Sequence, residues 1–205
     1  MAASKEFTLI RGKTFSQVVR WETQPIVYAA ITAISNAAPA TITAPGHGLP
    51  DGWRAAVVSV KGMREINAVN TPLRDADYRV CTVIDVNTVA LNEVNSSDFK
   101  AYAGGGYLQY NTPHPLTGYT CRWKIKDKVG GTLLLSTEPA DAPLNLLTAT
   151  VDTTAKTITL GLDALTSAAL SWSKAVHEAE MVAPDGKVYP LILPSKIVVS
   201  TEVAT

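Results

Sequence analysis

Hydrophobic and polar residues alternate along most of this chain, in short runs that turn residues separate. In the clearest example a run that begins near Ala179 ends at Pro184-Asp185-Gly186, and the run 187–193 follows directly. A further run, 197–203, completes this stretch. A period of two indicates strands with one buried face, and Pro-Asp-Gly is a turn sequence. We therefore predict a β-hairpin followed by a C-terminal strand.

Turn signals recur about every eight to twelve residues in the first half of the chain, a spacing typical of a small β-barrel or sandwich. The predicted strands in this part cover 26–34, 41–43, 55–60, 77–83, 88–91 and 107–110. Longer strands are predicted afterwards over 119–126, 132–136, 144–152 and 156–160, the last two pairing around Thr153-Thr154.

Two further segments complete the expected elements. Residues 7–21 alternate on either side of Gly12, which indicates one long or bulged strand with its bend at the glycine. Residues 163–174 give the one helix expected, with Asp163 as its N-cap and Leu165, Ala168 and Trp172 at helical spacing. We expect this short helix to cover one end of a sandwich.

Composition excludes several classes of function. The chain has 205 residues and a net charge of zero, with 18 basic and 18 acidic residues. The basic residues are scattered, whereas nucleic-acid binding usually requires a basic face, so no nucleic-acid partner is expected. No apolar run reaches the ~20 residues of a membrane span, and the N-terminus lacks the apolar core of a signal peptide. We expect a soluble protein that is made in a cytoplasm and has no membrane partner.

Candidate chemical groups are few. Cys81 and Cys121 lie outside any metal-binding spacing, which favours two buried free thiols and leaves a disulfide open. His47 lies between two glycines and is interpreted as a turn residue. Gly104-Gly105-Gly106 precedes a strand and lacks the lysine of a phosphate loop. The acidic pair Asp75 and Asp77 is typical of solvated loop charges, with weak cation binding as the alternative. We expect no metal, no cofactor and no enzymatic activity.

The aromatic residues suggest packing or contact roles. Trp123 alternates with Cys121 and Ile125 and is expected to point into a core. Trp53, beside Gly52, is expected to anchor a core or an interface, and a sugar-binding platform is the alternative. The candidate interface residues, chosen as exposed aromatic or apolar side chains, are Trp53, Met63, Tyr102 and Trp172.

Three segments resemble, in order, the small β-sandwich at the N-terminus of phage baseplate upper proteins. They are Ile10-Arg11-Gly12-Lys13-Thr14-Phe15, then Pro115 to Ile125 with its Leu-Thr-Gly-Tyr core, then the hairpin Glu180 to Tyr189 with the strand 198–203. The chain departs from that pattern at Pro194-Ser195-Lys196, where the family has a glycine, and at Val176-His177-Glu178, where it has tyrosine and aspartate.

The middle segment is similar to a small β-barrel repeat of phage tail and fibre proteins that was first named in ubiquitin-activating enzymes. The likeness rests on Ile42 to Leu49, Gly52, Val57-Val58, Asn67, Tyr78-Arg79-Val80 and Thr88 to Leu91. The repeat is a structural barrel, so it implies no catalytic residues here.

Together the resemblances imply an all-β protein: an Ig-like β-sandwich, residues 1–29 and 111–205, with a small β-barrel, residues 30–110, inserted after its first strand. They imply a structural component of a bacteriophage virion that assembles the tail or baseplate or anchors tail fibres. Its partners would be other virion proteins and further copies of itself, with a trimer favoured. Two alternatives stay open: a capsid decoration or head-to-tail connector protein, and a carbohydrate-binding receptor module.

Overall fold

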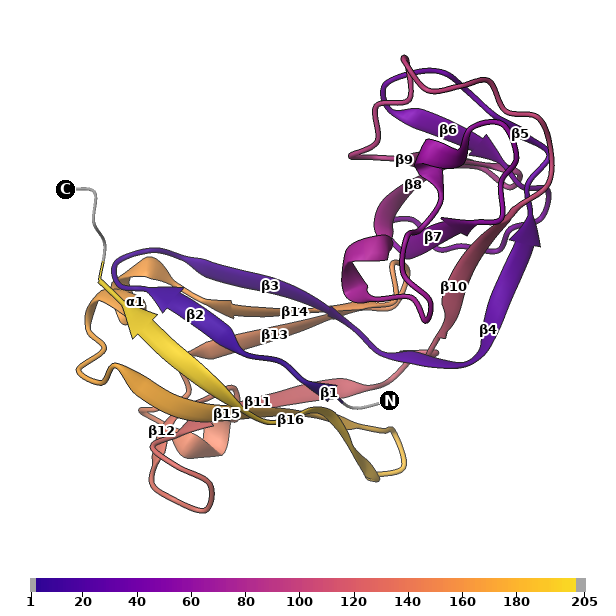
Figure 1. The fold of residues 1–205 in the computed structure, drawn as a ribbon. Helices are drawn as coiled ribbons and strands as arrows, with labels where there is room; N and C mark the ends of the chain where they lie inside the picture. The colour runs from indigo at the N-terminus through magenta and orange to yellow at the C-terminus, as the bar shows by residue number, and fades with distance from the viewer. Residues whose placement is uncertain (1–2, 202–205) are drawn as a thin grey trace. The chain divides into compact units, whose positions relative to one another are not determined.

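The computed structural model describes residues 3–201 and is all-β, with three sheets and one short α-helix. The chain divides into two compact units (Figure 1). The sandwich unit comprises residues up to Trp21 and from His114 onward, and the inserted unit runs from Glu22 to Pro113. The sequence placed these divisions at residues 30 and 110. The structure places them further out, because β4 (Glu22–Ala30) and β10 (Tyr107–Pro113) pair along their whole length within the inserted unit.

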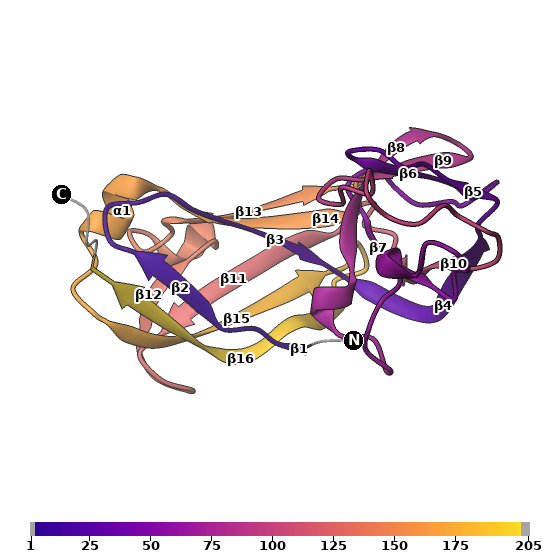
Figure 2. The same ribbon diagram turned by 45° about the horizontal axis from the view of Figure 1, so that its top comes forward.

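The sandwich unit packs a six-stranded sheet against a three-stranded sheet (Figure 2). The larger sheet contains β1 (Ala3–Ser4), β2 (Phe7–Ile10), β16 (Val188–Ser200), β15 (Lys174–Val182), β11 (Thr120–Lys126) and β12 (Leu133–Ser136). The smaller sheet contains β13 (Leu147–Asp152), β14 (Thr157–Leu162) and β3 (Phe15–Arg20). A 3-10 helix, η3 (Pro139–Asp141), follows β12.

Alternation along the strands explains the core between these sheets. Cys121, Trp123 and Ile125 of β11 all point inward and are buried, as the sequence predicted. They meet Leu160 from β14 and Leu9 from β2 in one cluster. Burying each such large apolar side chain stabilises the fold by about 1.5–3 kcal/mol.

The N-terminal segment corrects one expectation. Residues 7–21 are two strands, because β2 pairs in parallel with β16 whereas β3 pairs with β14 in the other sheet. Gly12 has φ +78° and turns the chain from one sheet to the other. The inserted unit therefore follows β3, the third strand, and not the first.

The C-terminal hairpin forms at the predicted turn, between β15 and β16. However, β16 is one strand of 13 residues where the sequence predicted two, because Ser195 and Lys196 continue the pairing with His177 and Val176. Register shifts opposite residues 177–180 accommodate the extra residues of β16 without ending the strand. The last two residues of the predicted run 197–203 lie outside the described residues. The predicted hairpin around Thr153-Thr154 also forms, with Asp152 opposite Thr157.

The helix α1 (Ala164–Ala168) is shorter than predicted, and Asp163 caps it by accepting a hydrogen bond from the Thr166 N–H at 2.8 Å. Ser167 faces the sandwich and donates its hydroxyl to the Lys13 carbonyl at 2.8 Å. Leu165 lies on the opposite side of the helix and is 84% exposed.

The inserted unit is a seven-stranded sheet with the order β4-β10-β7-β8-β9-β6-β5. Its remaining elements are β5 (Ala33–Ile34), β6 (Ala40–Thr43), β7 (Arg54–Val58), η1 (Arg64–Ile66), η2 (Asp75–Asp77), β8 (Arg79–Asp85) and β9 (Thr88–Leu91). Within residues 3–201 the pairings leave β4 and β5 as edges, so the sheet does not close into the predicted barrel. The edges are joined along the chain instead, where Ile31 donates to the Gly106 carbonyl and Thr32 to that of Thr43.

Candidate functional site

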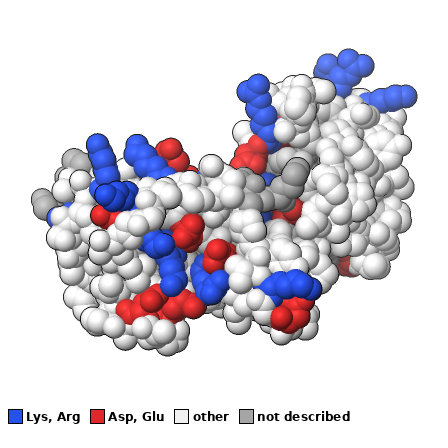
Figure 3. All heavy atoms as spheres, turned by 90° about the horizontal axis from the view of Figure 1, so that it is seen from below, with Lys and Arg blue, Asp and Glu red and all other residues white. Residues whose placement is uncertain are grey.

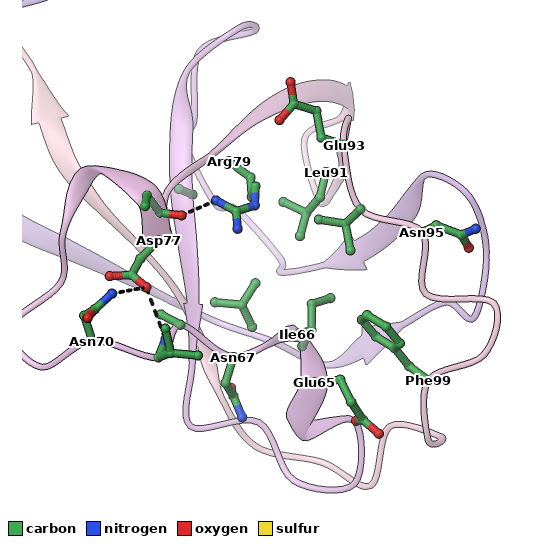
Figure 4. A pocket seen from close by; sticks show the side chains of 16 residues that line it. Glu65, Ile66, Asn67, Asn70, Asp77, Arg79, Leu91, Glu93, Asn95 and Phe99 are labelled. Atoms are coloured by element: carbon green, nitrogen blue, oxygen red, sulfur yellow. Dashed lines mark hydrogen bonds between the residues drawn. The ribbon is translucent and has the colours of Figure 1, made fainter.

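A groove opens on the inner side of the inserted unit's sheet, with a volume of about 370 Å³ (Figure 4). Its floor is apolar and combines side chains from two strands, a 3-10 helix and a loop. Ala55 and Val57 come from β7, Leu91 from β9, Ile66 from η1, and Val94 and Phe99 from the loop after β9. Ile66, Val94 and Phe99 pack on the unit's core but are only half-buried, so the floor retains accessible apolar surface.

Two side chains fix the backbone that forms the groove's walls. Asn67 accepts a hydrogen bond from the Val60 N–H at 2.8 Å and donates to the Val60 carbonyl at 3.0 Å, as a paired strand would. Asp77 accepts from the N–H groups of Arg74 at 2.8 Å and Val69 at 3.2 Å, and from the Asn70 amide at 3.1 Å. The Arg74 N–H in particular lowers the pKa of Asp77. These wall groups are thus committed to the fold.

The turn before η1 depends on Gly62. Its φ is +81°, and a Cβ there would lie 2.2 Å from the Ala101 carbonyl oxygen. The backbone 61–63 and the segment near residue 101 therefore approach more closely than any side chain allows. This approach places Glu65 and Ile66 at the groove.

Charged groups lie at the rim of the groove. Figure 4 shows Glu65 and Glu93 on opposite sides of the apolar floor. Both residues are exposed, and neither forms an ion pair or side-chain hydrogen bond with any residue that the structure describes. The guanidinium of Arg79 donates to the carbonyls of Ala76 and Tyr78. The rim is therefore acidic in net charge.

An ion-pair network ties β4 to β7 elsewhere in the same unit. Arg54 Nη2 donates to Glu22 Oε2 at 3.0 Å, and its Nη1 donates to Asp75 Oδ1 at 3.0 Å. Its guanidinium also lies 4.9 Å from the centre of the Tyr78 ring. Burial opposes the charge of Arg54, but hydrogen bonds and charges from both carboxylates outweigh it and raise the pKa of Arg54. This network therefore has a structural role: it holds β4 and η2 against β7.

The opposite side of the inserted sheet carries a group of seven uncharged side chains, which we call the uncharged face; Arg54, opposite Val80, and Asp85, opposite Thr88, border it. It consists of Val80, Thr82 and Ile84 of β8, Thr88 and Ala90 of β9, and Thr41 and Thr43 of β6. Thr82, Ala90 and Thr41 lie side by side across the three strands. Ile84 is 55% exposed and Val80 is 39% exposed. Hydroxyl and β-branched side chains therefore cover this face.

The outward side of the sandwich unit's large sheet differs. Arg122 pairs with Glu180 at 3.0 Å, and Lys124 with Asp141 at 2.9 Å. Acidic and basic side chains lie intermixed over this unit in Figure 3. Such a charged face is typical of the solvent-exposed side of an antiparallel sheet.

Of the four predicted interface residues, two are buried and two are half-buried. Trp53 and Met63 are completely buried in the core of the inserted unit, and Trp53 donates its indole N–H to the Asn111 carbonyl at 3.1 Å. The expectation that these two are exposed is wrong. Tyr102 is half-buried and donates its hydroxyl toward the carbonyls of Ile31 and Gly105. Trp172 is half-buried against the core of the sandwich unit. The structure does not bring the four together.

The other candidate groups are also engaged in the fold. His47 is buried; its Nδ1 accepts the Leu49 N–H and its Nε2 contacts the Asp85 carbonyl, each at 3.0 Å. This agrees with a turn role. Cys81 and Cys121 are buried thiols, as predicted, and they lie in different units and are not joined by a disulfide.

Sequence reasoning missed both the groove and the uncharged face. Residues 80–84 are mostly apolar on both sides of the strand, so alternation does not reveal which side faces out. Glu65 and Glu93 are far apart in sequence and gave no signal.

In the described part of the chain, no three His, Cys, Asp or Glu residues converge so as to hold a metal ion. Between residues 3 and 201, no helix is both long enough and apolar enough to cross a membrane. Comparison of the sequence with models of known families finds no match, and comparison with curated proteins finds no similar sequence.

Proposed function

We propose that the protein is a structural component of a bacteriophage virion, in the tail, baseplate or fibre-attachment region, and that it acts by assembly and not by catalysis. The support begins with the order of the resembling segments. Residues 10–15 form the crossing from β2 to β3, residues 115–125 lead into and form most of β11, and residues 180–189 form the β15–β16 hairpin. The segment that is similar to the barrel repeat lies in the inserted unit.

The uncharged face is the observation that carries the assembly role. The exposed side of an antiparallel sheet usually bears polar and charged residues, as β11 and β15 do here. Continuous surfaces that lack charge are typical of the centres of protein interfaces. The hydroxyls of Thr82 and Thr41 already donate, to Asn92 Oδ1 at 2.8 Å and to Ser35 Oγ at 2.9 Å, and each can still accept a hydrogen bond from a partner.

We propose further copies of this chain as the partners of the uncharged face, with a trimer favoured. Closed symmetry uses one contact repeatedly and so multiplies the stabilisation from a small surface. Other virion proteins would bind to the assembled ring.

Light scattering after size exclusion tests this proposal with two matched variants. Ile84→Lys places a charge in the uncharged face, and Leu165→Lys places the same charge at an isolated apolar residue on α1. We expect the unchanged protein and Leu165→Lys to be trimers, and Ile84→Lys to dissociate. Equal masses for all three proteins would contradict the role of the face.

A monomeric unchanged protein would instead favour the decoration or connector alternative, in which assembly depends on other virion proteins. The carbohydrate-binding alternative loses its proposed platform, because Trp53 is completely buried.

A further inference from the structure

The groove of the inserted unit leaves apolar side chains partly accessible to a ligand. Its floor exposes parts of Ile66, Val94 and Phe99, and Val69 at its edge is 88% exposed. At about 370 Å³ the groove lies within the usual size range of small-ligand sites. It therefore offers apolar contact area to a ligand.

The charge of the groove restricts what that ligand can be. Its lining contains three acidic residues, Glu65, Asp77 and Glu93, and one basic residue, Arg79, which gives a net charge of minus two. Asp77 is already saturated by hydrogen bonds from the backbone and Asn70. The two glutamates remain available at opposite sides of the floor (Figure 4).

We propose that the groove binds a lysine or arginine side chain of a partner polypeptide. Such side chains lay an aliphatic stem on apolar surface and keep the charged end in water, and this matches an apolar floor between exposed carboxylates. The stem would lie along Ile66 and Phe99, and the cation would reach Glu65 or Glu93. This proposal goes beyond the assembly proposal and does not depend on the uncharged face.

The walls favour this binding because they are built before the ligand arrives. Two contacts hold η1 in place: the pair of hydrogen bonds between the Asn67 side chain and the Val60 backbone, and the close approach of Gly62 to Ala101. Little binding free energy is therefore lost to ordering the groove when a ligand binds.

The experiment is a titration of the full chain, followed by NMR, with three peptides of the pattern acetyl-Gly-Leu-X-Leu-Gly-amide. X is lysine, norleucine or glutamate: norleucine keeps an aliphatic stem without the charge, and glutamate reverses the charge. We expect lysine to shift the methyl signals of Ile66 and Val94 and to bind about fivefold more tightly than norleucine, an effect that salt removes. The glutamate peptide is expected to bind most weakly.

Variants locate the charge effect. Glu65→Gln and Glu93→Gln are tested separately, with Glu6→Gln as a control that removes the same charge in the sandwich unit. At least one groove variant is expected to abolish the preference for lysine over norleucine, whereas Glu6→Gln retains it; the same spectra report folding. Equal binding of lysine and norleucine, shifts outside the groove, or no shifts would overturn the proposal.

Discussion

Trp123 donates its indole N–H to Nδ1 of His177 across 3.3 Å, deep in the sandwich unit. The other ring nitrogen of His177 contacts the Lys5 carbonyl at 2.8 Å, so it carries the proton. The Phe7 ring stacks on the imidazole at 4.4 Å between centroids. These contacts fix one neutral tautomer, and they join β15 and β11 to the segment that leads into β2.

Stability is therefore expected to fall in mild acid. Burial lowers the pKa of His177 from its usual 6.5, against the opposing effect of the Lys5 carbonyl. The unfolded chain then binds a proton more readily than the folded chain does. The stabilisation is complete above about pH 6.5 and is lost as the pH falls toward the folded pKa, by at most about 1.4 kcal/mol per pH unit for this group.

Urea unfolding from pH 8 to pH 5 measures this effect. His177→Phe is expected to reduce the dependence of the free energy of unfolding on pH, even though it lowers stability at every pH. Some dependence remains, because burial also lowers the pKa of His114. An unchanged pH dependence in His177→Phe would refute the assignment.

Removal of Arg54 is expected to destabilise the inserted unit. In Arg54→Met the Glu22 carboxylate, whose side chain is 15% exposed, loses its bidentate partner. We expect a loss of about 1–3 kcal/mol in the free energy of unfolding, since an uncompensated and partly buried charge remains. Lys187→Met breaks the exposed pair with Asp185 and is expected to cost less than about 1 kcal/mol. Equal losses in urea unfolding would contradict the network's role.

Comparison of Gly62→Ala with Gly186→Ala separates two costs of adding a Cβ: the strain of a positive φ and the steric clash with neighbouring atoms. Both glycines have positive φ, +81° and +82°, but only Gly62 would place a Cβ against another atom. Gly186→Ala is expected to cost about 1 kcal/mol, and Gly62→Ala at least about 1–3 kcal/mol more. Comparable losses would show that residues 61–63 and 101 do not approach each other as described.

The two thiols are expected to be unreactive in the folded protein. Burial raises the pKa of Cys121 to about 12, and Cys81 is completely buried. A thiol reagent such as Ellman's reagent should label neither residue at pH 8 in native buffer and both in guanidinium chloride. Rapid labelling without denaturant would indicate that one of the two cores is open.

Strand alternation and turn residues predicted most of the sandwich unit. The hairpin at 184–186 and the inward face of β11 follow from patterns within a few residues of each other. The separation of β2 from β3 did not, because a glycine between two alternating runs is typical of a bulge and of a turn alike. Only pairing with β16 and β14, more than a hundred residues away, decides between them.

The candidate sites were harder to predict for the same reason. Trp53 lies in a segment rich in turn residues, which suggested exposure. In the structure it is packed in the core of the inserted unit. The groove combines η1 with a loop some thirty residues later, and no local pattern signals that meeting. Which side of β8 faces solvent likewise depends on its pairing with β9.

The place of the protein in a particle can be measured by electron microscopy with gold-labelled antibodies raised against the purified chain. The sample is the phage particle that the encoding genome produces. We predict label at the tail, at its baseplate end or at the fibre attachments. Label on the capsid or its vertices, or particles without label, would contradict the assignment to the tail region.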